Sequence, residues 1–292
     1  MRPWSQLRPD ELTKRVDLPA VLATTTQVPA EPVPGATAEL GEHPVWVPTQ
    51  AVLIWVDIDT GRVLQTAASG LTEELFGGAG TVGAALPTST GRLTLLTSEG
   101  ALSVASDGSD PQPLAAAPPP GMRFNDAGLD AAGRLWAGVL PIEDPAPGEP
   151  PTGQLWRLDD AGQWQVEFAE MGCPNGIAWS ADGRTVLCCE SDTRQIAAAD
   201  YDPNTGRASN WRVAWWFVGA GDWVPDGLEW LPDGRLWVAF WGLGVAVRLT
   251  TAGQADLVIG TRDLRTTSVG TGTDGRIWVT TAAGLSVVAA PS

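Results

Sequence analysis

The sequence predicts an all-β protein folded as a six-bladed β-propeller. It contains 34 Gly, 24 Pro and 15 Trp with only 18% charged residues, a composition that favours strands and turns over long amphipathic helices. A turn-plus-strand unit also recurs, and its successive anchor residues lie 41, 42, 50, 51 and 41 residues apart. A period of about 40–50 residues with several short strands is typical of propeller blades. Six copies therefore predict six blades.

The clearest copy is WVPDGLEWLPDGRLWVAFW at 223–241. Two β-forming runs flank an Asp-Gly turn, which predicts a hairpin. The other copies are QAVLIWVD at Gln50, TGRLTLL at Gly91, AGRLWAG at Gly133, DGRTVLCC at Gly183 and DGRIWVTT at Gly275. Further strands are expected at 61–67, 100–106, 153–160, 163–169, 195–202, 210–217, 245–250, 255–260 and 284–290.

The N-terminal residues 1–34 stand apart from the propeller predicted over 35–292. Asp10 is placed to cap a short helix, and the Pro-rich stretch 29–35 then links to the first blade. This arm either packs on the outside of the domain or forms a partly ordered tail. The last blade is short of strands, so we expect residues 37–40 to complete it and to remove a free sheet edge.

Charge and hydropathy narrow the classes of partner and the location. The formal charge is −16, from 34 acidic and 18 basic residues, and a field of that sign repels phosphate backbones and anionic membrane surfaces. Nucleic acid and membranes are therefore not expected as partners, whereas a divalent cation is attracted. No apolar run is long enough for a transmembrane helix, and the N-terminus lacks the apolar region of a secretion signal. A cytoplasmic location is expected.

The cysteines and the histidine carry little chemistry of their own. Cys173, Cys188 and Cys189 are odd in number and two are adjacent, so they predict buried small hydrophobic residues rather than a disulfide framework. His43 is the single histidine, which excludes a zinc site built from several histidines.

The position eight residues before the anchor differs from one copy of the repeat to the next. It is occupied by Glu42, Asn125, Asn175 and Asp226, and Ser268 lies seven residues before the last anchor. Because the first strand of each blade lines the central channel, these side chains are expected to converge. Carboxylate and amide oxygens suit Ca²⁺, Mg²⁺ or Mn²⁺, and two neighbouring carboxylates without a cation would be costly. Each residue alone is also an ordinary turn former, but the shared register favours a metal site.

Five motifs carry a resemblance to a known family. They are LGEHPVW (40–46), RFNDAGLDAAGRLWAG (123–138), PNGIAWSADGRTVLCCESDTRQI (174–196), PDGLEWLPDGRLWVAFWG (225–242) and TSVGTGTDGRIWVTTA (267–282). Together they resemble the gluconolactonase/regucalcin (senescence marker protein) family of six-bladed propellers. The resemblance implies that a divalent metal is held by Glu42, Asn175 and Asp226. It further implies that Arg123, Asn125 and Glu143 contact substrate, with Asn125 near the metal.

Two features depart from the family pattern. His43 stands where the family more often has glycine or serine, directly beside Glu42. It is either a pocket residue with an acid/base role or variation at the rim. The arm 1–34 is longer than the family's usual start.

The main functional hypothesis is metal-dependent hydrolysis of a lactone or related ester. Calcium is the first candidate for the cation, with magnesium, manganese or zinc as the others, and the cation would polarise the carbonyl. Asp226 would orient or deprotonate the attacking water. Arg123 would bind ring or carboxylate oxygens through its planar fork.

Two alternatives stay open. Several tryptophans flank Asp226, and Trp223 is the one expected to line the pocket; an aromatic pocket would favour a bulky substrate and an isomerisation, elimination or cyclisation of secondary metabolism. The other alternative is a metal-binding or ligand-binding protein without catalysis. A small molecule is the expected partner in each case, and the chain is expected to be a monomer or a weak homo-oligomer.

Overall fold

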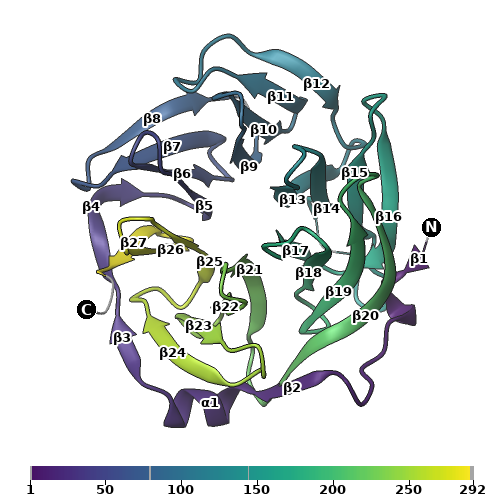
Figure 1. Cartoon of the computed structure of the whole chain (residues 1–292). Helices are drawn as coiled ribbons and strands as arrows, with labels where there is room; N and C mark the ends of the chain where they lie inside the picture. The colour runs from purple at the N-terminus through teal and green to yellow at the C-terminus, as the bar shows by residue number, and fades with distance from the viewer. Residues whose placement is uncertain (1, 79, 144, 290–292) are drawn as a thin grey trace.

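Six β-sheets stand around a central axis in the computed structural model, which describes residues 2–78, 80–143 and 145–289 (Figure 1). The sheets follow one another around the ring in chain order, and the chain of each meander runs from the axis outward. The N-terminal residues 2–37 add the outermost strand to four of the sheets. The predicted all-β, six-bladed propeller is confirmed. No helix within the described ranges is long and apolar enough to cross a membrane.

The blades, numbered 1 to 6 in chain order, are antiparallel meanders. Blade 1 consists of β5 (Gly41–Val47), β6 (Val52–Asp57), β7 (Arg62–Ala67) and β8 (Thr72–Gly77). Blade 2 consists of β9 (Val82–Pro87), β10 (Leu93–Thr97), β11 (Gly100–Val104) and β12 (Gln112–Ala116). Blade 3 consists of β13 (Met122–Leu129), β14 (Leu135–Pro141), β15 (Gly153–Leu158) and β16 (Trp164–Met171).

Blades 4 to 6 continue the same pattern. Blade 4 consists of β17 (Pro174–Trp179), β18 (Thr185–Glu190), β19 (Gln195–Asp202) and β20 (Arg207–Val218). Blade 5 consists of β21 (Val224–Trp230), β22 (Leu236–Trp241), β23 (Val245–Leu249) and β24 (Ala255–Gly260). Blade 6 takes β25 (Thr266–Thr271), β26 (Ile277–Thr281) and β27 (Gly284–Val288) from this end of the chain.

The strands expected from the repeat are present, although residue 290 of the last one lies outside the described residues. The hairpin of blade 5 has the predicted turn. Gly234 adopts a φ of +86°, its N–H donates to Leu231 O at 2.9 Å, and the Leu231 N–H donates to Arg235 O at 2.8 Å. Glycine is suited to this position because other residues are strained at positive φ.

The N-terminal arm packs along the outside of the ring. It comprises β1 (Arg2–Pro3), the 3-10 turn Trp4–Gln6, β2 (Lys14–Asp17), α1 (Leu18–Thr24), β3 (Gln27–Pro29) and β4 (Glu31–Thr37). Strands β1, β2 and β3 pair in parallel with the outermost strands of blades 3, 4 and 5, and Figure 1 shows this purple band passing from blade to blade. Of the two expectations for the arm, packing on the outside is the observed one.

The helix expected to begin at Asp10 lies instead at Leu18–Thr24. Asp17 caps it by accepting a hydrogen bond from Ala20 N, and Pro19 suits the first turn. Asp10 closes a turn by accepting from Leu12 N at 2.9 Å. The local capping signal at Asp10 was misleading because the residues after it pair with β20, and this tertiary pairing outweighs helix propensity.

Blade 6 is completed by the N-terminal segment, as expected. The strand is β4 at Glu31–Thr37, which shares only Thr37 with the predicted residues 37–40. The prolines of this stretch indicated a linker. They are tolerated because β4 is an edge strand, where an unpaired backbone nitrogen faces outward. The residue boundary at 34/35 falls within β4.

The arm contributes to the core, which leads to a stability prediction. Leu18 is fully buried in a cluster with Trp215 and Phe217 of blade 4. Leu18→Ala is expected to lower the free energy of unfolding by about 2–5 kcal/mol because it leaves a cavity. Leu12→Ala is the matched control, since Leu12 is 77% exposed, and it should change stability by less than about 0.5 kcal/mol. Denaturant unfolding measures both, and equal stabilities of the two variants would contradict a structural role for the arm.

A β-bulge interrupts the innermost strand of every blade at the same level. Each innermost strand has one more residue there than the strand it pairs with. The bulges lie at or beside the variable position of the repeat, at 43–44, 83, 125–126, 176, 226–227 and 267. A bulge re-aims the side chains around it, so it decides which end of the channel each one faces.

Glycine lets neighbouring innermost strands approach closely at this level. A Cβ on Gly176 would lie 2.7 Å from Leu228 N, and one on Gly227 would lie 2.5 Å from Ser268 Cβ. Both contacts are too short for any side chain. The glycines of the PNG and PDG motifs are therefore required for packing at the axis, while the residue before each glycine is free to supply chemistry.

Candidate active site

The central channel contains two cavities that share no lining residue. The first cavity, of about 230 Å³, is lined mainly by the early residues of the innermost strands and by the residues just before them. The second cavity is lined by residues further along the same strands. The lining of the first cavity is Leu40, Glu42, Arg123, Asn125, Cys173, Asn175, Ser191, Asp192, Val224, Asp226 and Trp241.

Two buried carboxylates lie in the first cavity. Glu42 is 6% exposed and Asp226 is 5% exposed. Burial raises the pKa of both groups well above the ordinary range; the negative charges of Asp226 and Asp126 raise that of Glu42 further, and the charge of Asp126 raises that of Asp226. Glu42 Oε2 accepts a hydrogen bond from His43 N at 3.0 Å, whereas Asp226 Oδ1 has no partner.

An amide oxygen completes this set. Asn175 Nδ2 donates to Ser191 Oγ at 3.3 Å, and its Oδ1 is buried without a partner. Buried oxygens are normally hydrogen-bonded, so two unpaired ones beside a second carboxylate indicate a missing positive partner. The described residues contain no group of three or more His, Cys, Asp or Glu side chains placed to hold a metal. The set instead mixes two carboxylates with an amide oxygen, which fits a hard divalent cation.

Arg123 supplies the positive charge of the first cavity. Its Nη1 donates to Asn125 Oδ1 at 2.8 Å and to Phe124 O at 3.0 Å. Asn125 Nδ2 in turn donates to Pro174 O at 3.0 Å, so the amide is fixed at both ends. The charge of Arg123 lowers the pKa of Glu42 and Asp226 and opposes the effect of burial. Asn125 is therefore an orienting residue for Arg123.

Six lining residues were not identified from the sequence as site residues: Leu40, Cys173, Ser191, Asp192, Val224 and Trp241. Cys173 had been interpreted as a core residue. Burial raises the pKa of its thiol, so it stays protonated and is a poor nucleophile. Its position two residues before Asn175 was the available signal. Ser191 and Asp192 follow β18, and nothing in the repeat marks them.

Trp223 does not line the first cavity, which corrects the expectation from the sequence. It is 2% exposed, its Nε1 donates to Ala220 O at 3.1 Å, and the guanidinium of Arg194 lies 3.9 Å from its ring centre. The ring packs edge-on against Phe240. Trp241 is the tryptophan that the cavity contains.

Three other candidates lie elsewhere. Ser268 and His43 line the second cavity. Glu143 is exposed beyond the end of β14 and is not a lining residue of the first cavity. The structure therefore brings together Glu42, Arg123, Asn125, Asn175 and Asp226, and it separates His43, Glu143, Trp223 and Ser268 from them.

His43 has an unusual backbone. Its φ of +52° lies in the left-handed region, where a residue with a side chain is strained by about 1–2 kcal/mol. The His43 Nδ1 to Asp126 Oδ1 contact of 2.6 Å ties blade 1 to blade 3 and helps to hold this conformation. Glycine, one of the small residues that the resemblance associates with this position, would adopt this positive φ with less strain.

The fold and the lining define the class as a six-bladed β-propeller with a polar, carboxylate-bearing cavity on its axis. The family model described as the SMP-30/Gluconolactonase/LRE-like region matches residues 40–283, and the chain belongs to this family.

Relatives agree with this assignment. The chain is 32% identical to regucalcin of Gallus gallus, over 72% of this chain and 71% of that protein. It is 28% identical to a pentonolactonase of Haloferax volcanii, over 59% of this chain and 57% of that protein, so the match spans little more than half of the relative. A crystal structure described as a calcium-binding regucalcin of Agrobacterium tumefaciens has a TM-score of 0.78 at 21% identity, covering 90% of this chain and 94% of that one, which shows the shared fold.

Proposed function

We propose that the protein is a divalent-metal-dependent hydrolase of a lactone or a related ester. The observation that carries the proposal is the pair of unpaired, buried oxygens of Asn175 and Asp226, which lie with the carboxylate of Glu42 in one cavity. The names of the relatives support the reaction class, because one is a pentonolactonase. The family description also includes gluconolactonase.

The cation would be held by Glu42, Asn175 and Asp226. When bound, it supplies Lewis acidity that polarises a carbonyl and stabilises negative charge developing on its oxygen. Calcium is the first candidate, because a structure with the same fold is described as calcium-binding. Magnesium, manganese and zinc remain in the proposal as alternatives.

Residues of the first cavity would activate the water molecule and bind the substrate. Asp226 has two carboxylate oxygens, so one could hold the cation while the other orients a water molecule and accepts its proton. Arg123 is held by Asn125 and Phe124 O, so its remaining N–H groups are available for oxygens of the substrate. A role for Glu143 in substrate binding stays a prediction.

The size of the first cavity limits the substrate. About 230 Å³ suits a small molecule such as a sugar lactone. The aromatic argument for a bulky substrate is weaker than the sequence indicated, because Trp223 is packed away and Trp241 is the tryptophan in the lining. Lactone hydrolysis therefore has better support than a tailoring step on a large apolar scaffold.

A substrate panel tests the proposal. Aldonolactones, an aromatic ester and an organophosphate are assayed by acid release with Ca²⁺, Mg²⁺, Mn²⁺ or Zn²⁺ and with an EDTA-treated control. We expect EDTA-sensitive hydrolysis that is fastest for the aldonolactones. Hydrolysis of none of these compounds by protein that binds the cation would contradict a hydrolase and favour the non-hydrolytic alternative.

A further inference from the structure

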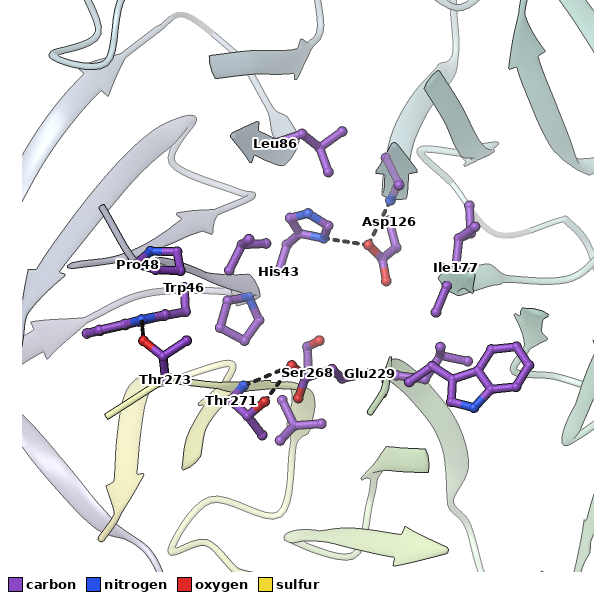
Figure 2. A pocket seen from close by; sticks show the side chains of 18 residues that line it. His43, Trp46, Pro48, Leu86, Asp126, Ile177, Glu229, Ser268, Thr271 and Thr273 are labelled. Carbon is purple, nitrogen blue, oxygen red and sulfur yellow. Dashed lines mark hydrogen bonds and ion pairs between the residues drawn. The ribbon is translucent and has the colours of Figure 1, made fainter. Parts of the chain in front are cut away.

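The second cavity, of about 350 Å³, is lined by residues that lie further along the innermost strands than those of the first (Figure 2). Residues from all six blades line it. Much of its wall is apolar or aromatic, including Trp46, Leu86, Ile177 and Trp230, and its lining contains no Lys or Arg. A cavity of this size and character is suited to a small organic molecule rather than to water alone.

Glu229 of blade 5 presents an unpaired oxygen at this cavity. Its Oε1 accepts hydrogen bonds from Thr271 N at 3.1 Å and from Thr271 Oγ1 at 2.8 Å, which fixes the carboxyl group (Figure 2). Its Oε2 is buried and has no partner. Burial raises the pKa of Glu229 to about 7. A buried oxygen of this kind is costly without a donor, so an occupant that donates a hydrogen bond is favoured.

Asp126 of blade 3 and His43 of blade 1 form a second polar group in the wall. Asp126 Oδ1 accepts from Ala127 N at 2.7 Å and pairs with His43 Nδ1 at 2.6 Å, as the dashed lines in Figure 2 show. His43 Nε2 is buried without a hydrogen-bond partner. Two blades thus present a buried polar atom without a partner at this cavity, Glu229 Oε2 of blade 5 and His43 Nε2 of blade 1.

The charges around the second cavity select the class of occupant. Two carboxyl groups face it with no Lys or Arg in the lining, and indole rings attract cations. An ammonium group carries three donors and a positive charge. A bare metal ion fits less well, because calcium takes six to eight oxygens at about 2.3–2.6 Å, whereas this wall is largely apolar. The described residues also hold no cluster of three His, Cys, Asp or Glu side chains placed for a metal.

We propose that the second cavity binds a small organic ammonium compound, whose charged nitrogen donates to Glu229 and whose apolar body lies against Trp46 and Trp230. The two cavities share no lining residue, so the proposed site is separate from the site of the proposed hydrolase activity.

Calorimetric titration of the whole chain with phenethylammonium tests the proposal, with 2-phenylethanol as the neutral analogue and CaCl₂ as the inorganic cation. The wild type is expected to bind the ammonium compound at least about tenfold more tightly than the alcohol, because one charged hydrogen bond is typically worth that much. Glu229→Gln should remove this preference and weaken ammonium binding about tenfold. Asp226→Asn, which alters the first cavity, should change neither.

Any of three results would overturn the proposal. The wild type could bind phenethylammonium no more tightly than 2-phenylethanol, Glu229→Gln could bind phenethylammonium as tightly as the wild type, or Asp226→Asn could lose phenethylammonium binding. Saturation by CaCl₂ that blocks phenethylammonium would assign the cavity to an inorganic cation instead.

Proton release gives a readout in the wild type, in case Glu229→Gln fails to fold. The other titratable groups in the lining are His43 and Asp126. Because the pKa of Glu229 is raised to about 7, ammonium binding should release about half a proton at pH 7 and almost none at pH 8.5. Titration in two buffers of different ionisation enthalpy measures this. No release at pH 7 would contradict a contact with Glu229.

Discussion

Replacing Asp226 with asparagine is expected to reduce kcat/KM for lactone hydrolysis by about a thousand-fold or more, or about 4 kcal/mol of transition-state stabilisation. The change keeps the shape of the side chain but removes a charged ligand and a proton acceptor. The fold should be retained. Because burial raises the pKa of Asp226, removing this charge should leave the melting temperature of the cation-free protein at pH 8 unchanged or higher.

The matched control is Asp233→Asn in the turn of the same hairpin. Asp233 bonds Arg235 at the surface, and its side chain is 50% exposed. This variant should keep kcat/KM within about twofold of the wild type, since surface substitutions of this kind have small effects. Steady-state kinetics with an aldonolactone compares the two. More than a tenth of the wild-type activity in Asp226→Asn, or equal losses in both variants, would refute the role given to Asp226.

Adding Ca²⁺ to cation-free protein is expected to raise the melting temperature, and more so at pH 8 than at pH 5. The pKa of Glu42 and of Asp226 is raised in the folded state, so the folded protein holds these protons more tightly than the unfolded chain does. Without a cation, the contribution of these two groups to stability is therefore greatest at low pH and falls as the pH rises above the ordinary carboxyl range. A bound cation offsets the ionised carboxylates.

At a cation concentration a hundred times its Kd, the stabilisation is about 2.7 kcal/mol, or roughly 5 °C or more for a chain of this size. Differential scanning fluorimetry at both pH values measures it. Glu42→Gln with Asp226→Asn is the control and should lose both the shift and its pH dependence. A shift that persists in this double variant would place the cation elsewhere.

Much of the fold follows from the repeat. The Asp-Gly turns and the β-forming runs fix local hairpins, so the blade strands lie where these patterns predict them. The arm was harder to predict, because β1, β2 and β3 pair in parallel with strands distant in the chain and show no periodicity of their own. The prolines of β4 also conceal an edge strand within what looks like a linker.

The candidate site was predictable where its residues occupy the same position of the repeat in different blades. Glu42, Asn125, Asn175 and Asp226 reach one cavity because each stands at a bulge on an innermost strand. The direction of neighbouring residues was not predictable, since the bulge sends Glu42 to one cavity and His43 to the other. Trp223 precedes β21 and packs against Phe240, so its proximity in sequence to Asp226 does not place it in the first cavity.

The most direct test of the central claim is the rate of aldonolactone hydrolysis by chelator-treated protein, measured as a divalent cation is added back. The rate should be close to background without the cation and should rise to a plateau at one cation bound per chain, with Asp226→Asn remaining near background throughout. Full activity in the chelator-treated protein, with no response to any of the four cations, would contradict metal-dependent hydrolysis at Glu42, Asn175 and Asp226.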